Sequence, residues 1–257
     1  MRSHPRSIRA AGLALAILGA GAGPAAAQDR PAAADSAALL YRQAKALHAL
    51  GGAANQDSAV RLLVRAVALY DSYGAASSGA HVLNDIGAIH LEAARLDSAR
   101  HYLVWALRIY GHMNRWETAG PTLLNLGHVA RRLGQPDTAL VAYRTAAALG
   151  ERYGDPAVYA AATHGFGSSW ADLEQPDSAI PYYRLALSAF RAQGERPSEA
   201  DVLTDLAHAI NERGDAVTAL ALLREALAIY QEICDVEGEQ HVRFNIVQLE
   251  RQRAPRK

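Results

Sequence analysis

The residues with the clearest capacity for chemistry are histidines at related positions of the chain. His48, His128 and His208 follow one another at intervals of 80 residues, and His164 and Asp205 lie between the last two. Imidazole and carboxylate groups bind zinc, which holds its nitrogen ligands at about 2.0–2.1 Å. Helices pack about 8–10 Å apart, so side chains two stacked units apart are separated by roughly 20 Å. Only His164, Asp205 and His208 could converge, and because no full ligand set is visible we predict no metal site.

Other catalytic arrangements are missing from the sequence. It contains no nucleophile elbow, no glycine-rich phosphate loop and no paired-carboxylate site. We therefore predict a protein that is not an enzyme and that needs no cofactor. Cys234 is the single cysteine, which excludes an internal disulfide and a cysteine-based metal cluster. We expect it to be a small buried residue on a helix, with an intermolecular disulfide as the alternative.

The first 27 residues have the organisation of a secretory signal peptide. Three arginines and no acid precede an apolar run from Ala10 to Ala22, and Pro24-Ala25-Ala26-Ala27 supplies a small-residue cleavage site. A membrane-spanning helix needs roughly 20 strongly apolar residues, whereas this run is shorter and rich in glycine. We predict cleavage after Ala27, an exported protein that is periplasmic or secreted, and no stable membrane insertion after cleavage.

The net charge of the chain limits the kinds of partner that it can bind. The chain has 26 Lys+Arg and 26 Asp+Glu, and removal of residues 1–27 leaves 23 basic against 26 acidic residues. Nucleic acids and anionic membranes are held largely by surplus Lys and Arg. Because the mature chain is slightly acidic, we predict that neither nucleic acid nor an anionic membrane is its main partner.

These residues belong to a repeat of 40 residues. Small residues recur at Gly87, Gly127, Gly167 and Ala207, with Val247 at the same phase of a final incomplete unit. Two alanine columns share the spacing: Ala59, Ala99, Ala139, Ala179 and Ala219; and Ala66, Ala106, Ala146, Ala186 and Ala226. A fixed period of this length is typical of solenoid proteins, whose units pack only on their neighbours.

Each unit has the apolar spacing of two helices separated by a turn. Leu123, Leu126 and Ala130 share one face, and Ala139 and Tyr143 share another after the turn. The small residues let paired helices approach closely, and larger ones fill the space between units: Leu63, Leu103, Tyr143, Tyr183 and Leu223. Because one pair would leave an apolar face exposed, we predict an all-α solenoid of stacked antiparallel helix pairs.

The columns resemble those of the tetratricopeptide repeat. Leu83, Ile86, Gly87, Ala99 and Leu103 fall at that family's spacing. Units of 40 rather than 34 residues, with a Leu-Asn-x-Ile-Gly opening, are similar to the extended subclass of kinesin light chains and bacterial arrays. The resemblance implies a right-handed superhelix with units at about 35–75, 79–115, 119–155, 158–195 and 199–235, and a capping half-unit at 237–253.

The ends of the array carry separate predictions. Residues 28–34 are expected to form a short linker and 254–257 a tail, with Asp35-Ser36 capping the first helix. In the cap, Phe244, Ile246 and Leu249 are expected to pack inward.

The resemblance also implies a concave groove lined by the first helix of each unit, where a partner's segment would bind. The residues at the groove positions are Lys45, His48, Asn84, Asp85, Asn125, His128, Arg131, His164, Asp205, His208, Asn211, Asn245 and Gln248. Asn125 and Asn245 are the strongest candidates, because a side-chain amide both donates to and accepts from a peptide backbone. Their alternative role is that of ordinary solvated residues on a helix.

Two further hypotheses concern the groove. Arg131 and Arg132, with Lys45, could clamp a partner's carboxylate, although no other unit offers matching basic residues. Gly165 removes a side chain from a groove position and could form a notch for a partner's bulky residue.

Together these features predict a non-enzymatic adaptor that binds a protein or peptide in the groove. The alternative is a structural component that assembles with itself, since homo-oligomerisation through terminal units is possible. A metal-dependent role around His164, Asp205 and His208 is a third and weaker hypothesis.

Overall fold

The computed structural model describes residues 30–253, which contain eleven α-helices, one short 3-10 helix and no strand. The five pairs are α2 (Arg30–Ala49) with α3 (Ala53–Ser72), α4 (Ala76–Glu92) with α5 (Leu96–His112), α6 (Gly120–Arg132) with α7 (Pro136–Tyr153), α8 (Pro156–Asp172) with α9 (Pro176–Gln193), and α10 (Arg196–Glu212) with α11 (Ala216–Glu232). A last helix, α12 (Val236–Arg253), follows. The predicted all-α solenoid of helix pairs is confirmed.

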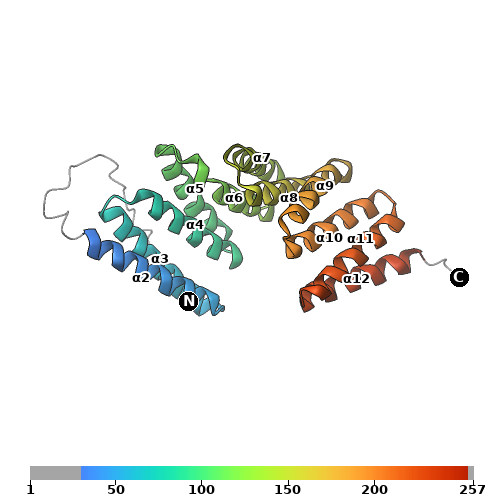
Figure 1. The fold of residues 1–257 in the computed structure, drawn as a ribbon, viewed down its shortest axis with the longest axis horizontal. Coiled ribbons are helices and arrows are strands. Elements are labelled where there is room, and N and C mark those ends of the chain that lie inside the picture. Colours follow the sequence, from blue (N-terminus) through green and yellow to red (C-terminus); the bar gives the residue numbers. More distant parts are fainter. Residues whose placement is uncertain (1–29, 254–257) are drawn as a thin grey trace, which may run out of the picture.

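The pairs stack into an arc with α2 at one end and α12 at the other (Figure 1). The first helix of each middle unit touches both the helix before it and the helix after it, and α6 also contacts α4 and α8. The first helices therefore form a continuous inner row, while α5, α7 and α9 lie toward the outer side of the arc (Figure 1).

The core includes the residues that the repeat columns predicted. All ten alanines of the two alanine columns are fully buried, and the residues between units, from Leu63 to Leu223, are buried as well. The glycine column works by close approach: a Cβ built on Gly87 would lie 2.5 Å from Leu103. Any larger residue at Gly87 would push α4 and α5 apart, so the column must stay small.

The first helix begins earlier than predicted. Residues 30–34, expected to belong to a linker, lie inside α2, and the Asp35-Ser36 pair therefore stands within the helix instead of capping it. The sequence Pro31-Ala32-Ala33-Ala34 explains the difference, because proline is tolerated in the first turn and alanine is the strongest helix former.

The third unit departs from the period at its start. The helices α4, α8, α10 and α12 begin at residues 76, 156, 196 and 236, but α6 begins at 120 and is preceded by a 3-10 turn, Trp116–Thr118. Pro121 accounts for the interruption, because its ring lacks a backbone donor and clashes with the carbonyl four residues earlier.

Two side chains near the C-terminus lie where we did not expect them. Cys234 is exposed, and its φ of 58° places it in the turn between α11 and α12 rather than buried on a helix. Phe244 does not pack inward, because 61% of it is exposed on α12. Leu249 is buried and Ile246 is partly buried, as predicted.

The predicted signal peptide lies outside the described residues, as does the tail at 254–257. Among residues 30–253, none of the helices is sufficiently long and apolar to span a membrane.

Candidate binding surface

The predicted groove residues of the first two units are paired with one another. The Asp85 carboxylate accepts a hydrogen bond of 2.8 Å from the Tyr41 hydroxyl and lies 3.7 Å from the Lys45 ammonium. The His48 imidazole lies 3.3 Å from the Glu92 carboxylate. These contacts join α2 to α4, so they tie the first unit to the second.

An amide pair joins the second unit to the third. The Asn125 side-chain nitrogen donates to the Asn84 side-chain oxygen at 3.2 Å, and the Thr122 hydroxyl donates to the same oxygen at 3.1 Å. Asn84 is buried by these neighbours. The sequence placed both asparagines correctly in one row, but Asn84 stabilises the stack and is not open to a partner.

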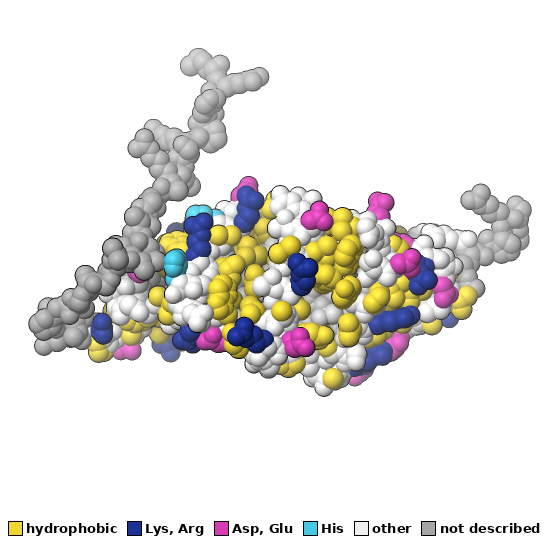
Figure 2. All heavy atoms as spheres, turned by 90° about the horizontal axis from the view of Figure 1, so that it is seen from above, with side chains coloured by type: hydrophobic (Ala, Val, Ile, Leu, Met, Phe, Trp, Pro, Cys, Tyr) yellow, Lys and Arg dark blue, Asp and Glu magenta, His cyan; other side chains and the backbone are white. Residues whose placement is uncertain are grey.

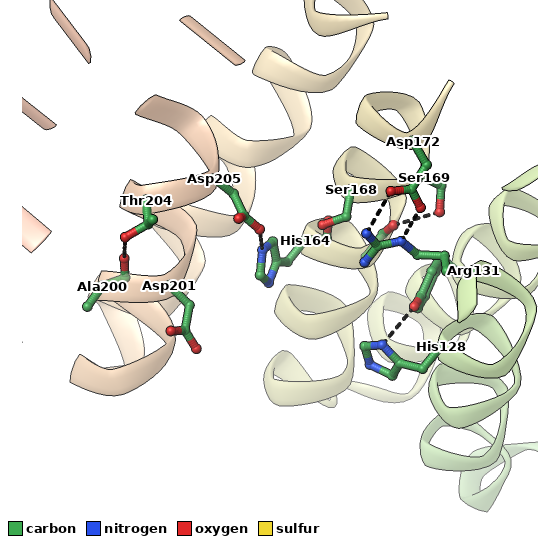
Figure 3. A network of polar contacts seen from close by, with 12 residues as sticks. His128, Arg131, His164, Ser168, Ser169, Asp172, Ala200, Asp201, Thr204 and Asp205 are labelled. Carbon is green, nitrogen blue, oxygen red and sulfur yellow. Dashed lines mark hydrogen bonds and ion pairs between the residues drawn. The ribbon is translucent and has the colours of Figure 1, made fainter. Parts of the chain in front are cut away.

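The arginines proposed as a clamp are also engaged. Arg131 binds the Asp172 carboxylate of the next unit with two hydrogen bonds, of 2.6 and 3.0 Å (Figure 3). Arg132 donates to the backbone carbonyl of Leu91 at 2.6 Å. Both guanidinium groups therefore link neighbouring units and are already engaged where a clamp would need them free.

His128 lies beside this ion pair and is held neutral. One of its ring nitrogens, Nδ1, is 3.0 Å from the Tyr143 hydroxyl (Figure 3 labels His128). Desolvation by the surrounding side chains, followed by the positive charge of Arg131, lowers the pKa of His128 to about 4. The imidazole at this position therefore carries no charge at neutral pH.

The three residues of the metal hypothesis, His164, Asp205 and His208, do not all come together. His164 lies 2.8 Å from the Asp205 carboxylate of the next unit (Figure 3), so two of the three predicted groups do converge. His208 is turned toward Asn245, whose amide nitrogen donates to it at 3.2 Å. Within residues 30–253 no three His, Cys, Asp or Glu side chains gather in a way that could hold a metal ion.

Four predicted residues do come together around a hollow at the C-terminal end of the inner row. His208 and Asn211 of α10 face Asn245 and Gln248 of α12 across a space of about 130 Å³. We call this space the C-terminal hollow; its remaining lining is Ala207, Leu223, Leu249 and Gln252. Its walls therefore offer one imidazole and four side-chain amides over an apolar floor.

The notch predicted at Gly165 is filled from within the chain. A Cβ built on Gly165 would lie 2.4 Å from the Tyr143 ring, and one built on Gly127 would lie 2.5 Å from it. Tyr143 is fully buried. The hypothesis of a notch for a partner's residue is therefore wrong: Gly165 is a packing glycine that accommodates the tyrosine of the preceding unit.

Sequence reasoning missed an apolar hollow on the outer side of the arc. It lies between α5 and α7 with α6 as its floor, has a volume of about 580 Å³, and is lined by residues including Val104, Leu126, Leu133 and Val141. We call it the outer hollow. Figure 2, a view of this side, shows hydrophobic side chains in bands across the middle of the molecule. Val104 and Val141 stand in different columns of the repeat, so the period did not indicate this hollow.

Comparison with known proteins agrees with the repeat. The family model described as "Tetratricopeptide repeat" matches residues 118–192 and 158–232. No curated protein matches the sequence. The prediction of tetratricopeptide repeats is confirmed for this part of the chain, whereas the 40-residue subclass and the signal peptide stay predictions.

Solved structures of similar fold include an aspartyl phosphate phosphatase F from Bacillus subtilis, at 16% identity and a TM-score of 0.71 over 85% of this chain and 56% of that one. A Rap protein complexed with Competence and Sporulation Factor gives 11% identity and a TM-score of 0.58, over 84% of this chain and 75% of that one. TPR-like repeats from Podosopora anserina, described as a kinesin light chain, give 16% identity and a TM-score of 0.59, over 80% of this chain and 97% of that one. The chain spans little more than half of the first of these structures, and at such identities the likeness shows the fold alone.

Proposed function

We propose that this protein is an exported, non-enzymatic adaptor that binds a protein or peptide segment along the inner row of its helices. Binding centres on the C-terminal hollow, where His208, Asn211, Asn245 and Gln248 gather. The observation that carries the proposal is this convergence of amide groups from two helices. Amides can pair with the backbone of an extended segment of any sequence, because each donates and accepts.

The rest of the inner row supports the hollow by holding the helices in place. Contacts from Lys45–Asp85 to His164–Asp205 join each unit to the next. A surface that is already ordered loses little conformational entropy on binding, so the cost of ordering falls mainly on the partner. The paired residues therefore contribute stiffness, and Asn211 and Gln248 contribute recognition.

The likeness to a Rap protein that is complexed with Competence and Sporulation Factor adds support, since a protein of similar fold there forms a complex with another molecule. Export rests on the residue pattern of the first 27 positions. A fusion of residues 1–34 to a reporter that is active only outside the cytoplasm tests that part separately; an inactive reporter would contradict it.

The binding proposal is tested with residues 28–257 and a displayed library of random peptides. Selected peptides are titrated by fluorescence polarisation against the unchanged protein and against Asn211→Ala/Gln248→Ala. We expect the double variant to lose about tenfold in affinity, as removal of two hydrogen-bonding side chains predicts. Gln56→Ala, which removes an amide on α3, is the matched control and should bind normally.

Two results would overturn the assignment. Peptides that bind the double variant as tightly as the unchanged protein would show that the C-terminal hollow is not the site. Loss of binding in Val141→Asp, with no loss in the double variant, would place the site in the outer hollow instead.

A further inference from the structure

The last helix presents an exposed apolar face that no other first helix has. Each preceding first helix packs against the second helix of its own unit, as α10 packs on α11, whereas no helix follows α12 within residues 30–253. Phe244 is 61% and Val247 42% exposed there. Val247 stands in the column of Gly87, which contacts Leu103 of the following helix. The exposed face of α12 is therefore the side on which a following helix would pack.

The residues on this face have the spacing of a helix-pairing seam. Glu237, Gln240, Phe244, Val247 and Arg251 follow one another at alternating steps of three and four residues, and all five are exposed. Such alternation keeps side chains on one stripe of a helix and is the pattern by which two helices pair. The stripe is apolar at its centre, acidic toward the start of α12 and basic toward its end.

We propose that this stripe binds the same stripe of a second copy of the chain, with the two α12 helices antiparallel about a two-fold axis at Phe244. Glu237 and Arg251 each stand seven residues from Phe244, which is about 10.5 Å along the helix. Antiparallel pairing therefore sets Glu237 of each copy opposite Arg251 of the other, twice over. Parallel pairing would set like charges against each other. A two-fold contact must be self-complementary, and this distribution of charge satisfies that condition.

Phe244 and Val247, at the centre of the stripe, are too large for the close packing seen between the two helices of one unit. They fit pairing with a second α12 better. Where α4 meets α5, the contact needs Gly87, because a Cβ there would lie 2.5 Å from Leu103. Val247 prevents such an approach, and Phe244 adds further bulk. The larger spacing between helices that pair through interlocking side chains accommodates both residues.

The residues beside the stripe are already paired within their own copy. Arg243 binds Glu239, at 2.7–2.8 Å, and Glu250 binds Arg224 at 2.9 Å. Among the charged residues of the stripe, neither Glu237 nor Arg251 forms an ion pair within residues 30–253. The two copies therefore meet through an apolar centre, two exposed charges at each end and a polar rim.

The test is the mass of residues 28–257 across a wide range of concentration, by sedimentation equilibrium. We expect a reversible dimer, and we expect Phe244→Ala to raise its dissociation constant at least tenfold, since a central aromatic residue is lost from both copies. Leu185→Ala removes an exposed apolar residue from α9 and should leave the constant unchanged. Circular dichroism melts of each variant confirm that it is folded.

Charge reversal fixes the orientation. Glu237→Arg and Arg251→Glu should each weaken the dimer about tenfold, because each replaces two attractions by two repulsions. The double variant Glu237→Arg/Arg251→Glu restores opposite charges and should dimerise as the unchanged chain does. A monomer at every concentration would overturn the proposal, and so would a double variant as weak as either single one. Neither result bears on peptide binding at the C-terminal hollow, which is measured independently.

Discussion

Two neighbouring junctions between helices pack in opposite ways. Where α7 meets α8, a Cβ built on Gly150 would lie 2.7 Å from the backbone nitrogen of Tyr159, so the two backbones touch. Between α5 and α7, above α6, the outer hollow leaves about 580 Å³ open. We call the first the closed junction and the second the open junction. The chain therefore uses one repeat length for both a dense contact and a gap.

The difference comes from single residues in shared columns. The column of Gly150 holds an aromatic residue in the other complete units, at Tyr70, Tyr110, Phe190 and Tyr230. Loss of that ring lets α7 and α8 approach. The same unit carries Tyr143 between Gly127 and Gly165, where most other units have leucine in the tyrosine column. The period thus sets where helices stand, and exceptions within columns set how closely they pack.

The largest effect is expected from Gly165→Leu, which would break the closed junction. Its Cβ would lie 2.4 Å from the ring of Tyr143, and that ring is fully buried against Gly127 on its other side. Because the tyrosine cannot move aside, we expect a loss of about 3 kcal/mol in the free energy of unfolding, measured by urea denaturation.

A control for Gly165→Leu is a helix glycine near the end of α5, at Gly111. A Cβ on Gly111 would lie 3.2 Å from the ring of Trp116, which is partly exposed and can shift. Gly111→Ala should therefore change stability by less than about 1 kcal/mol. Equal losses in Gly165→Leu and Gly111→Ala would remove the distinction between the two junctions.

Gly150→Ala tests the backbone contact itself. The nearest atoms to its Cβ are backbone atoms of Tyr159 and Asp155, which cannot rotate away. Alanine gains up to about 1 kcal/mol in helix propensity, but the overlap should cost more, and we expect a net loss of about 1–2 kcal/mol. Thermal unfolding that shows a more stable Gly150→Ala protein would mean that α8 can shift to accommodate the methyl group.

Much of the fold could be predicted from the sequence because its columns are regular. The alanine columns and the residues from Leu63 to Leu223 are buried as their spacing indicated. The errors lie where the repeat has no neighbouring copy to constrain it. Arg30 begins the first helix through local alanine propensity, and Phe244 is exposed because no helix of residues 30–253 covers it.

The candidate site was harder to predict than the fold. Phase along a helix placed Asn125 and Arg131 on the inner row, but it could not show that Asn84 and Asp172 would meet them from adjoining units. Whether two residues of adjoining units touch depends on the angle between their helices, and that angle depends on the particular side chains packed between them. Gly165 was misread for that reason, since its partner Tyr143 belongs to the preceding unit.

A substitution that fills the outer hollow tests the open junction. Ala142 of α7 lines the hollow, and Ala142→Leu would place an apolar side chain into it. Leucine is nearly as good a helix former as alanine, and the buried methyl groups should add about 1 kcal/mol to the free energy of unfolding. Ala146→Leu, four residues along at a fully buried position, should destabilise instead. Denaturation curves in which both variants lose stability would show that the hollow is not available space.

The smallest expected effect is the dependence of stability on acid at His128, beside the closed junction. Its pKa is lowered to about 4, first by desolvation and then by Arg131, whereas an unfolded histidine titrates near its usual value of about 6.5. Between pH 6.5 and 4 the unfolded chain therefore binds a proton that the folded chain does not, so stability falls as the pH falls through this window. Tyr143 covers the Nδ1 side of the His128 ring, but the residue as a whole stays exposed to solvent, so screening should limit its share to less than about 1 kcal/mol. His128→Gln removes the titrating group, and its free energy of unfolding should decline less between pH 7 and pH 4.5 than that of the unchanged protein. If the two proteins lost stability equally between pH 7 and pH 4.5, neither desolvation beside Tyr143 nor the charge of Arg131 would be lowering the pKa of His128.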